Sequence, residues 1–303
     1  MFGKDSENSR NFHECIEFNS YIDYLKNKNR PKCLQEFEKL NKTTDSIYDL
    51  GNLNALIILK DGTNLTRWLD VDNKSEVLYV SEDLSGYTDL SRRYSGLTSL
   101  KAIVATGVSA NVTNTEGMFR SCESLVDISS LKDWNVSNVC NMRSMFHGCR
   151  SIRDFSGLKD WDVSRVENMQ GMFNSCRSLE NLNFMKDWRV SNVTNMNHMF
   201  YSCWGLNDLS ALKNWDVSRV GNMKWMFCGC KNLKNLYGLN DWKVSRLLEI
   251  DYMFMGCEGL TDVSDINGWN LNRRMWRVFF SCGELNNFPK WYKSFDGFGG
   301  FAV

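Results

Sequence analysis

The stretch WNVSNVCNMRSMFHGC, residues 134–149, decides the fold because close copies of it follow along the chain. The copies WDVSRVENMQGMFNSC, WRVSNVTNMNHMFYSC and WDVSRVGNMKWMFCGC begin at Trp161, Trp188 and Trp215. The tryptophan that opens the stretch recurs at one constant step, at Trp134, Trp161, Trp188, Trp215, Trp242 and Trp269. A fixed period of this size predicts a solenoid, in which each repeat buries its apolar face only against its neighbours. We count seven repeats between Gly107 and Cys282.

Within one repeat the apolar spacing changes. Met142, Met145, Phe146 and Cys149 follow each other at i, i+3, i+4 and i+7, which predicts a short helix with one apolar stripe. The next segment, SIRDFSGL, has apolar residues three apart and predicts a short extended strand. We therefore expect an α/β repeat solenoid, leucine-rich-repeat-like, with short parallel strands on one face and short helices on the other. Columns of Trp, Val, Met, Phe, Cys and Leu would fill its core.

The pattern W-x-V-S-x-V-x-N-M-x-x-M-F-x-x-C-x-x-L-x-x-L resembles the BspA-like leucine-rich-repeat family, the bacterial surface protein 26-residue repeat type. The resemblance covers roughly Gly107 to Cys282. It implies a leucine-rich-repeat solenoid and a binding or adhesion role, often on microbial cell surfaces. This chain departs from the family in its longer step, from Trp134 to Trp161, and in lacking a signal or lipid-attachment motif.

The two ends do not repeat. Residues 1–106 predict an α+β N-terminal cap, with helices to about residue 50, interrupted near Pro31, and then strands around the DGT turn at 61–63. A separate partner-binding module is the alternative. Residues 283–303 are rich in Phe, Trp and Tyr. We expect this C-terminal segment to cap the last repeat or to act as a docking peptide, since open solenoid ends need covering.

Composition limits the classes of function. The chain has 36 basic and 36 acidic residues, which argues against nucleic-acid binding or general adhesion to membrane surfaces. The apolar run ALIIL, residues 55–59, is too short to span a bilayer, and the first residues contain no apolar signal core. We therefore expect an intracellular, cytoplasmic or particle-associated protein, with the cell surface as the alternative if the sequence is truncated.

The cysteines follow the repeat. Seven of the eleven share one repeat position: Cys122, Cys149, Cys176, Cys203, Cys230, Cys257 and Cys282. One cysteine per coil at a core position indicates a small buried hydrophobe with a reduced thiol. Disulfide or zinc binding is the alternative.

The sequence contains no pattern that supports an enzyme. Neither a Walker motif, a G-x-G-x-x-G loop nor a G-x-S-x-G elbow is present. His13, His147 and His198 occupy unrelated positions, and DVDN at 70–73 lacks the glycine and glutamate of a calcium loop. We predict a non-enzymatic chain with no cofactor and no metal site.

Two sets of positions are candidates for recognition. A possible strand-face stripe is formed by Asp127, Asp154, Asn181, Asp208, Asn235 and Asp262. These side chains either face outward as an acidic ligand stripe or bond the backbone. On the predicted helix, two rows outside the apolar stripe turn aromatic or apolar from the fourth repeat onward. The candidate partner-binding residues are His198, Tyr201, Trp225, Cys228, Tyr252 and Met255, with the exposed Trp204 elsewhere on the surface.

A localised apolar ridge of this kind is usually covered by something. The cover is either the C-terminal segment or a partner chain. The sequence thus predicts a non-enzymatic protein-binding or scaffold module that presents its repeat surface to an unidentified protein partner. The alternatives are a structural subunit of a larger assembly or particle, with oligomers possible, and a cell-surface adhesin.

Overall fold

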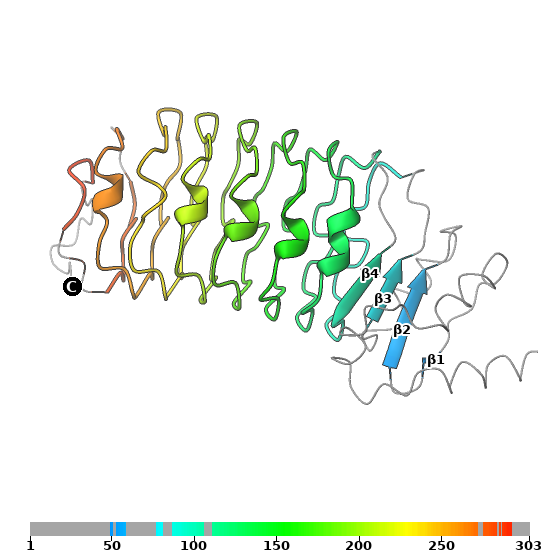
Figure 1. The fold of residues 1–303 in the computed structure, drawn as a ribbon. Coiled ribbons are helices and arrows are strands. Elements are labelled where there is room, and N and C mark those ends of the chain that lie inside the picture. Colours follow the sequence, from blue (N-terminus) through cyan, green and yellow to red (C-terminus); the bar gives the residue numbers. More distant parts are fainter. Residues whose placement is uncertain are drawn as a thin grey trace, which may run out of the picture.

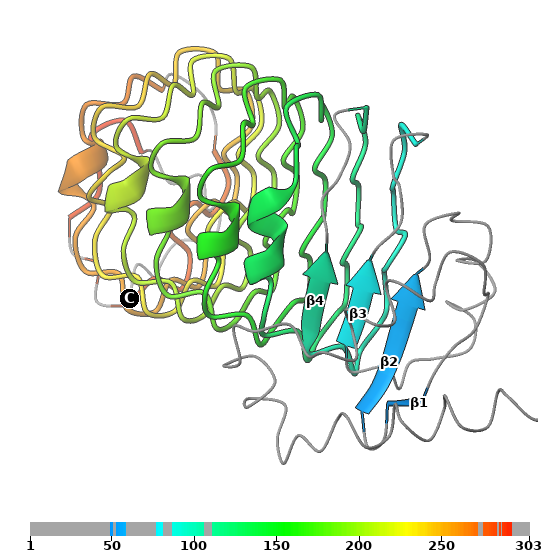
Figure 2. The ribbon, with the colours of Figure 1, turned by 45° about the vertical axis from the view of Figure 1, so that its right-hand side comes forward.

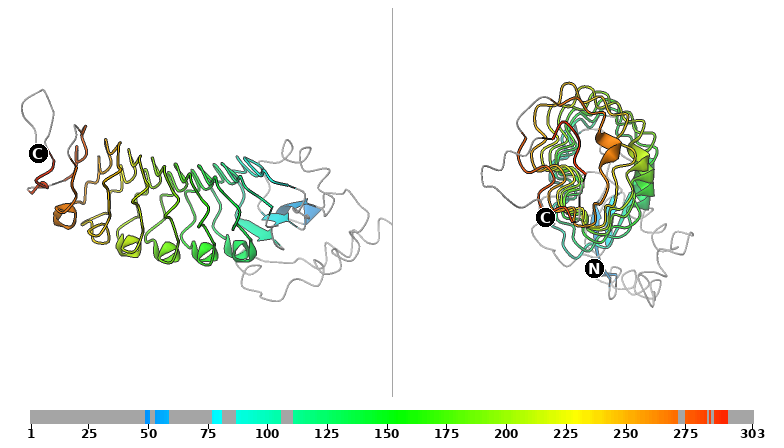
Figure 3. Two further views of the ribbon diagram at one scale, coloured as in Figure 1. Left: turned by 90° about the horizontal axis from the view of Figure 1, so that it is seen from above. Right: turned by 90° about the vertical axis from the view of Figure 1, so that its left-hand side faces the viewer.

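The fold is that of a computed structural model that describes residues 49–50, 53–58, 77–80, 87–105, 111–271, 275–283, 285 and 287–292. The helices expected before residue 50, the DGT turn, the DVDN motif, His13 and the chain beyond residue 292 lie outside these residues. Successive repeats stack as coils along one axis (Figure 1). Seen along that axis, the coils superimpose as rounded outlines (Figure 3).

A small sheet begins the stack. Strands β1 (Asp49–Leu50), β2 (Leu53–Ile58), β3 (Val77–Val80) and β4 (Ala102–Ala105) lie in the order β1-β2-β3-β4. β1 and β2 are antiparallel, whereas β2, β3 and β4 are parallel. The strands expected around the DGT turn are therefore present as β2 and β3, which are parallel neighbours. Ala102 of β4 pairs in parallel with Asp127, so the sheet leads directly into the coils.

The position of the helices differs from the prediction. The helices in the described part of the chain are short 3-10 turns, and they lie in the segment expected to be extended: η2 (Ser129–Asp133), η3 (Ser156–Leu158), η4 (Asn183–Met185), η5 (Ser210–Leu212) and η6 (Ser264–Ile266). They form one row beyond β4, along the same side of the stack as the strands (Figure 2). The prediction placed helices in the segment NMRSMFHGC and strands in the segment SIRDFSGL. That assignment is wrong, because the 3-10 turns lie in the second segment.

The segment NMRSMFHGC is a chain of turns and not a helix. The N–H groups of Met145 and His147 donate within the coil, to the carbonyl groups of Met142 and Ser144 at 3.3 and 3.1 Å. The N–H groups of Ser144 and Phe146 donate instead to the next coil, at 2.8 and 2.9 Å. Ser144 adopts φ 53°, a left-handed conformation that an α-helix does not accommodate. Apolar spacing alone could not reveal this break.

The coil pattern starts earlier than the repeat in the sequence. Asp89 pairs in parallel with Asn114, as Asn114 pairs with Asn141. The ring of Tyr94 stacks on Phe119 at 5.5 Å, where later coils have phenylalanine. The stack therefore includes a coil from residue 89 onward, and its step to the next coil is slightly shorter than the steps that follow.

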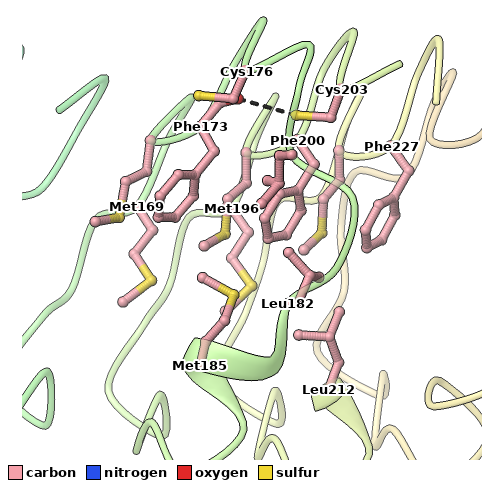
Figure 4. Packing of buried hydrophobic residues seen from close by; sticks show 14 of the residues in the cluster. Met169, Phe173, Cys176, Leu182, Met185, Met196, Phe200, Cys203, Leu212 and Phe227 are labelled. Atoms are coloured by element: carbon pink, nitrogen blue, oxygen red, sulfur yellow. Dashed lines mark hydrogen bonds between the residues drawn. The ribbon is translucent and has the colours of Figure 1, made fainter. Parts of the chain in front are cut away.

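The core is built from columns of identical side chains, as the repeat predicts. Phe173, Phe200 and Phe227 are fully buried and stack at 5.9 and 5.4 Å (Figure 4). The thiol of Cys203 donates to the carbonyl oxygen of Phe173 at 3.1 Å. The indole N–H of Trp215 donates to the carbonyl of Met185 at 3.1 Å. Each coil is thus hydrogen-bonded to its neighbour through side chains as well as backbone.

The last coil is covered by residues 287–292. Trp291 stacks on Trp269 at 6.0 Å, and its indole N–H donates to the carbonyl of Ile266 at 2.8 Å, which extends the tryptophan column by one member. Tyr292 packs edge-on against Phe279 at 5.1 Å. These residues close the end of the core, so in this part of the C-terminal segment the aromatic side chains act as a cap.

Candidate functional site: an aromatic ridge on left-handed residues

Each coil places two residues of the turn segment in the left-handed region, four positions apart. The second of them is always glycine or serine: Gly96, Ser121, Gly148, Ser175, Ser202, Gly229, Gly256 and Ser281. The first of them varies in type, and we call these residues the left-handed column. The left-handed column contains Arg92, Gly117, Ser144, Gly171, His198, Trp225, Tyr252 and Arg277, with φ between 47° and 62°. Glycine adopts this conformation without strain, whereas an L-residue costs roughly 1–2 kcal/mol there. Gly117 and Gly171 therefore adopt this conformation without strain, whereas the six other members of the column, including Arg92 and Arg277, adopt it at that cost.

The three residues after Gly171 in this column are aromatic, and their rings stack. Trp225 and Tyr252 lie 4.1 Å apart with an interplanar angle of 9°. His198 stacks on the other side of Trp225 at 5.8 Å. Tyr201 contacts Trp225 edge-on at 6.2 Å. We call His198, Tyr201, Trp225 and Tyr252 the aromatic ridge; all four are half-buried.

The other predicted partner-binding residues do not all join the ridge. Cys228 is 5% exposed but is not part of the core cluster, and burial raises the pKa of its thiol to about 11. Met255 is half-buried in the row of Tyr201. Trp204 is 39% exposed and lies under the Arg177 guanidinium, whose Cζ is 3.9 Å from the ring centroid. The ridge proper is thus smaller than the predicted set.

The pKa values of His198 in the ridge and of the neighbouring His147 are lowered in the fold. Burial lowers the pKa of His198, and the charge of Lys224 lowers it further. Burial also lowers the pKa of His147, with Arg120, His198 and Arg150 adding to the effect. His198 also hydrogen-bonds to the amide oxygen of Asn197. The lowered pKa favours the neutral imidazole of His198, which stacks on Trp225 as an uncharged ring.

The predicted strand-face stripe is engaged with backbone. Each side chain accepts a hydrogen bond from the N–H two residues later: Asp127 from Ser129, Asp154 from Ser156, Asn181 from Asn183, Asp208 from Ser210, Asn235 from Tyr237 and Asp262 from Ser264. These distances run from 2.8 to 3.2 Å. Such Asx turns explain why Asp and Asn interchange freely in the row.

Sequence reasoning overlooked the basic residues that flank the ridge. The turn segments 141–151, 168–178, 195–205 and 222–232 contain no Asp or Glu. The same segments carry Arg143, Arg150, Arg177, Lys224 and Lys231. Comparing one repeat position at a time did not reveal this pattern, because the five basic residues are divided between two repeat positions. Counting charges over whole turn segments would have revealed it.

The described residues contain no group of three His, Cys, Asp or Glu side chains placed to hold a metal ion. The nine cysteines in the described part of the chain are free thiols. Eight of these are buried, and Cys140 is exposed. Among the described helices, none has the length and apolar character needed to cross a membrane.

Solved structures that match the chain include leucine-rich repeat proteins, the class to which the resemblance points. A protein from Bacteroides ovatus is 18% identical with a TM-score of 0.42; the match covers 64% of this chain and 46% of that one. A protein from Eubacterium ventriosum is 14% identical with a TM-score of 0.40, and the match covers 72% and 62% of the two chains. A protein from T. pallidum is 17% identical with a TM-score of 0.32, over 81% and 86%.

The chain thus spans about half the length of the Bacteroides ovatus structure. No curated protein matches it significantly. A family model described as "Mycoplasma protein of unknown function, DUF285" matches residues 88–209 and 204–294. This match begins at the coil of Asp89 and covers more than half of the sequence. The chain belongs to the DUF285 family.

Proposed function

We propose that this protein is a non-enzymatic binding module whose aromatic ridge receives a partner protein. One observation carries the proposal: His198, Trp225 and Tyr252 occupy left-handed positions that Gly117 and Gly171 fill elsewhere in the same column. Strained residues that the fold does not require are concentrated at functional sites. The coils need a left-handed residue here, but nothing in the packing of the core requires an aromatic one.

The composition of the ridge suits an interface. Tryptophan and tyrosine are the commonest anchors of protein–protein contacts. Phe280, 41% exposed, and Trp276, 52% exposed, extend the apolar surface into the last coil. Residues 287–292 pack on Trp269 and Phe279 instead, so this part of the C-terminal segment does not cover the ridge.

Comparative affinity capture tests the proposal. The wild-type chain and the double variant Trp225→Gly, Tyr252→Gly would each be used as bait in lysate of the source cells. Glycine is chosen because the column accepts it without strain, so the variant should stay folded. The matched control is Tyr237→Ala, which removes a 52% exposed tyrosine outside the ridge. We expect a protein that is retained by wild type and by the control and lost by the double variant. An identical set of captured proteins for all three baits would refute the proposal.

The location of the protein is a separate question. Neither the fold nor the family match supports the intracellular location expected from the sequence, and display at the cell surface is the alternative that we propose to test. Protease treatment of intact cells would digest a displayed chain and spare an internal one.

A further inference from the structure

A strip of positive charge accompanies the aromatic ridge. We call Arg143, Arg150, Arg177, Lys224 and Lys231 the basic strip; they come from turn segments without a single acidic residue. The acidic residues of the same rows lie only in the outer coils, at Glu116, Glu123, Asp251 and Glu258. In a chain with no formal net charge, this separation makes the middle coils locally positive on the face that carries the ridge.

The outer members of the strip are paired with these acids. Arg150 lies 3.3 Å from Glu123, and Lys231 lies 2.8 Å from Glu258. Arg143 approaches Glu116 at 4.0 Å, and Lys224 approaches Asp251 at 3.9 Å. All four pairs are partly exposed, so each contributes little to stability. Among the described residues, they leave the centre of the strip without a carboxylate.

Arg177 occupies that centre. Within the described residues it has no acidic partner, and its Nε is buried without a hydrogen-bond acceptor. Its guanidinium lies over Trp204, with Cζ 3.9 Å from the ring centroid, and the Nζ of Lys231 lies 5.9 Å from the same ring. Contact with an aromatic face restricts the orientation of a guanidinium, while its terminal N–H groups can still bind a carboxylate. Trp204 is three residues from Tyr201 of the ridge.

We propose that the partner is an acidic segment of a protein, which places a carboxylate on Arg177 and apolar side chains on the aromatic ridge. This inference rests on the proposed function. Arginine binds carboxylates through two parallel charge-assisted hydrogen bonds, and the neighbouring bases complement further acidic residues. A nucleic acid fits less well, because proteins bind its bases on free aromatic faces. The two faces of Trp225 are already occupied by His198 and Tyr252.

Peptide selection tests the inference with a defined probe. A random twelve-residue peptide library displayed on phage would be selected on the whole chain, and individual peptides would be measured by fluorescence anisotropy. We expect Asp and Glu to be enriched over the starting library. Selected peptides should lose at least about tenfold in affinity on Arg177→Gln, since charge-assisted hydrogen bonds are lost. Arg177→Lys, which keeps the charge but not the planar fork, should give an intermediate loss.

Arg153→Gln is the matched control, because Arg153 is an exposed arginine outside the strip; it should leave affinity unchanged. A pool without acidic enrichment, or with equal affinity for Arg177→Gln, would overturn the inference about charge. If such a pool still depended on Trp225 and Tyr252, the proposed function would stand. Peptides insensitive to both sets of variants would overturn the proposed function as well. Displacement of the peptides by a thymidine oligonucleotide at lower concentration would instead indicate a nucleic-acid site.

Discussion

Replacing Trp225 by glycine and, separately, by alanine measures the backbone strain on which the functional argument depends. Both substitutions remove the same ring and the same 4.1 Å stack on Tyr252, so these losses cancel when the variants are compared. Trp225 has φ 62°, where alanine costs roughly 1–2 kcal/mol and glycine none. Glycine gains more entropy on unfolding, by about 0.4–1 kcal/mol. The net expectation is that Trp225→Gly is about 1 kcal/mol more stable than Trp225→Ala.

Urea unfolding followed by the fluorescence of the remaining tryptophans would measure this difference, provided that both variants share one m-value. The neighbouring Lys224 is the control, because it is not among the left-handed residues. At that position the order should reverse, with alanine more stable than glycine by roughly 0.5–1 kcal/mol. If Trp225→Ala were as stable as Trp225→Gly, the left-handed column would carry no strain, and our reason for assigning function to the ridge would fail.

Three further predictions concern the core, the histidines and the cap. Burial raises the pKa of the Cys122 thiol to about 12, so a maleimide at neutral pH should modify the exposed Cys140 and spare Cys122 until urea unfolds the chain. Peptide mapping that finds both cysteines labelled at the same rate would contradict the burial of the cysteine column. The pKa values of His147 and His198 are lowered in the fold, so the unfolded chain binds protons first and stability should decline as pH falls below about 6.5. The urea midpoint should depend less on pH over that range in the variant His147→Gln, His198→Gln. Trp291→Phe keeps a ring over Trp269 but loses the 2.8 Å bond to Ile266, which should cost about 1 kcal/mol, while Trp291→Ala should lower the melting temperature further.

The constant step between repeats was sufficient to predict the stacking of coils and the composition of the core. Phe200, Cys203 and Trp215 are buried in the columns where the repeat places them. The type of local structure was not predictable in the same way. An apolar spacing of i, i+3, i+4 fits a helix, but it also fits successive turns interrupted by a left-handed residue such as Ser144. Serine in that conformation leaves no signal in a single sequence.

Part of the candidate site could also be predicted from the sequence. Fixed register places His198, Trp225 and Tyr252 in neighbouring coils, so their proximity follows from the numbering. The same reasoning could not show that Cys228 is buried or that Arg177 lies over Trp204. Both depend on which way a side chain leaves a turn. The sequence also could not show the left-handed column, and it is this backbone conformation that makes an aromatic residue strained at these positions.

The central claim is that recognition occurs on the aromatic ridge and its basic strip. Hydroxyl-radical footprinting tests this most directly, because tryptophan, tyrosine and histidine are readily oxidised and form the ridge itself. The whole chain would be oxidised with and without a saturating acidic peptide from the selection. We predict that Trp225, Tyr252, His198 and Trp204 become protected while the exposed Tyr237 does not. Protection of Tyr237 with unchanged oxidation of Trp225 and Trp204 would contradict the account.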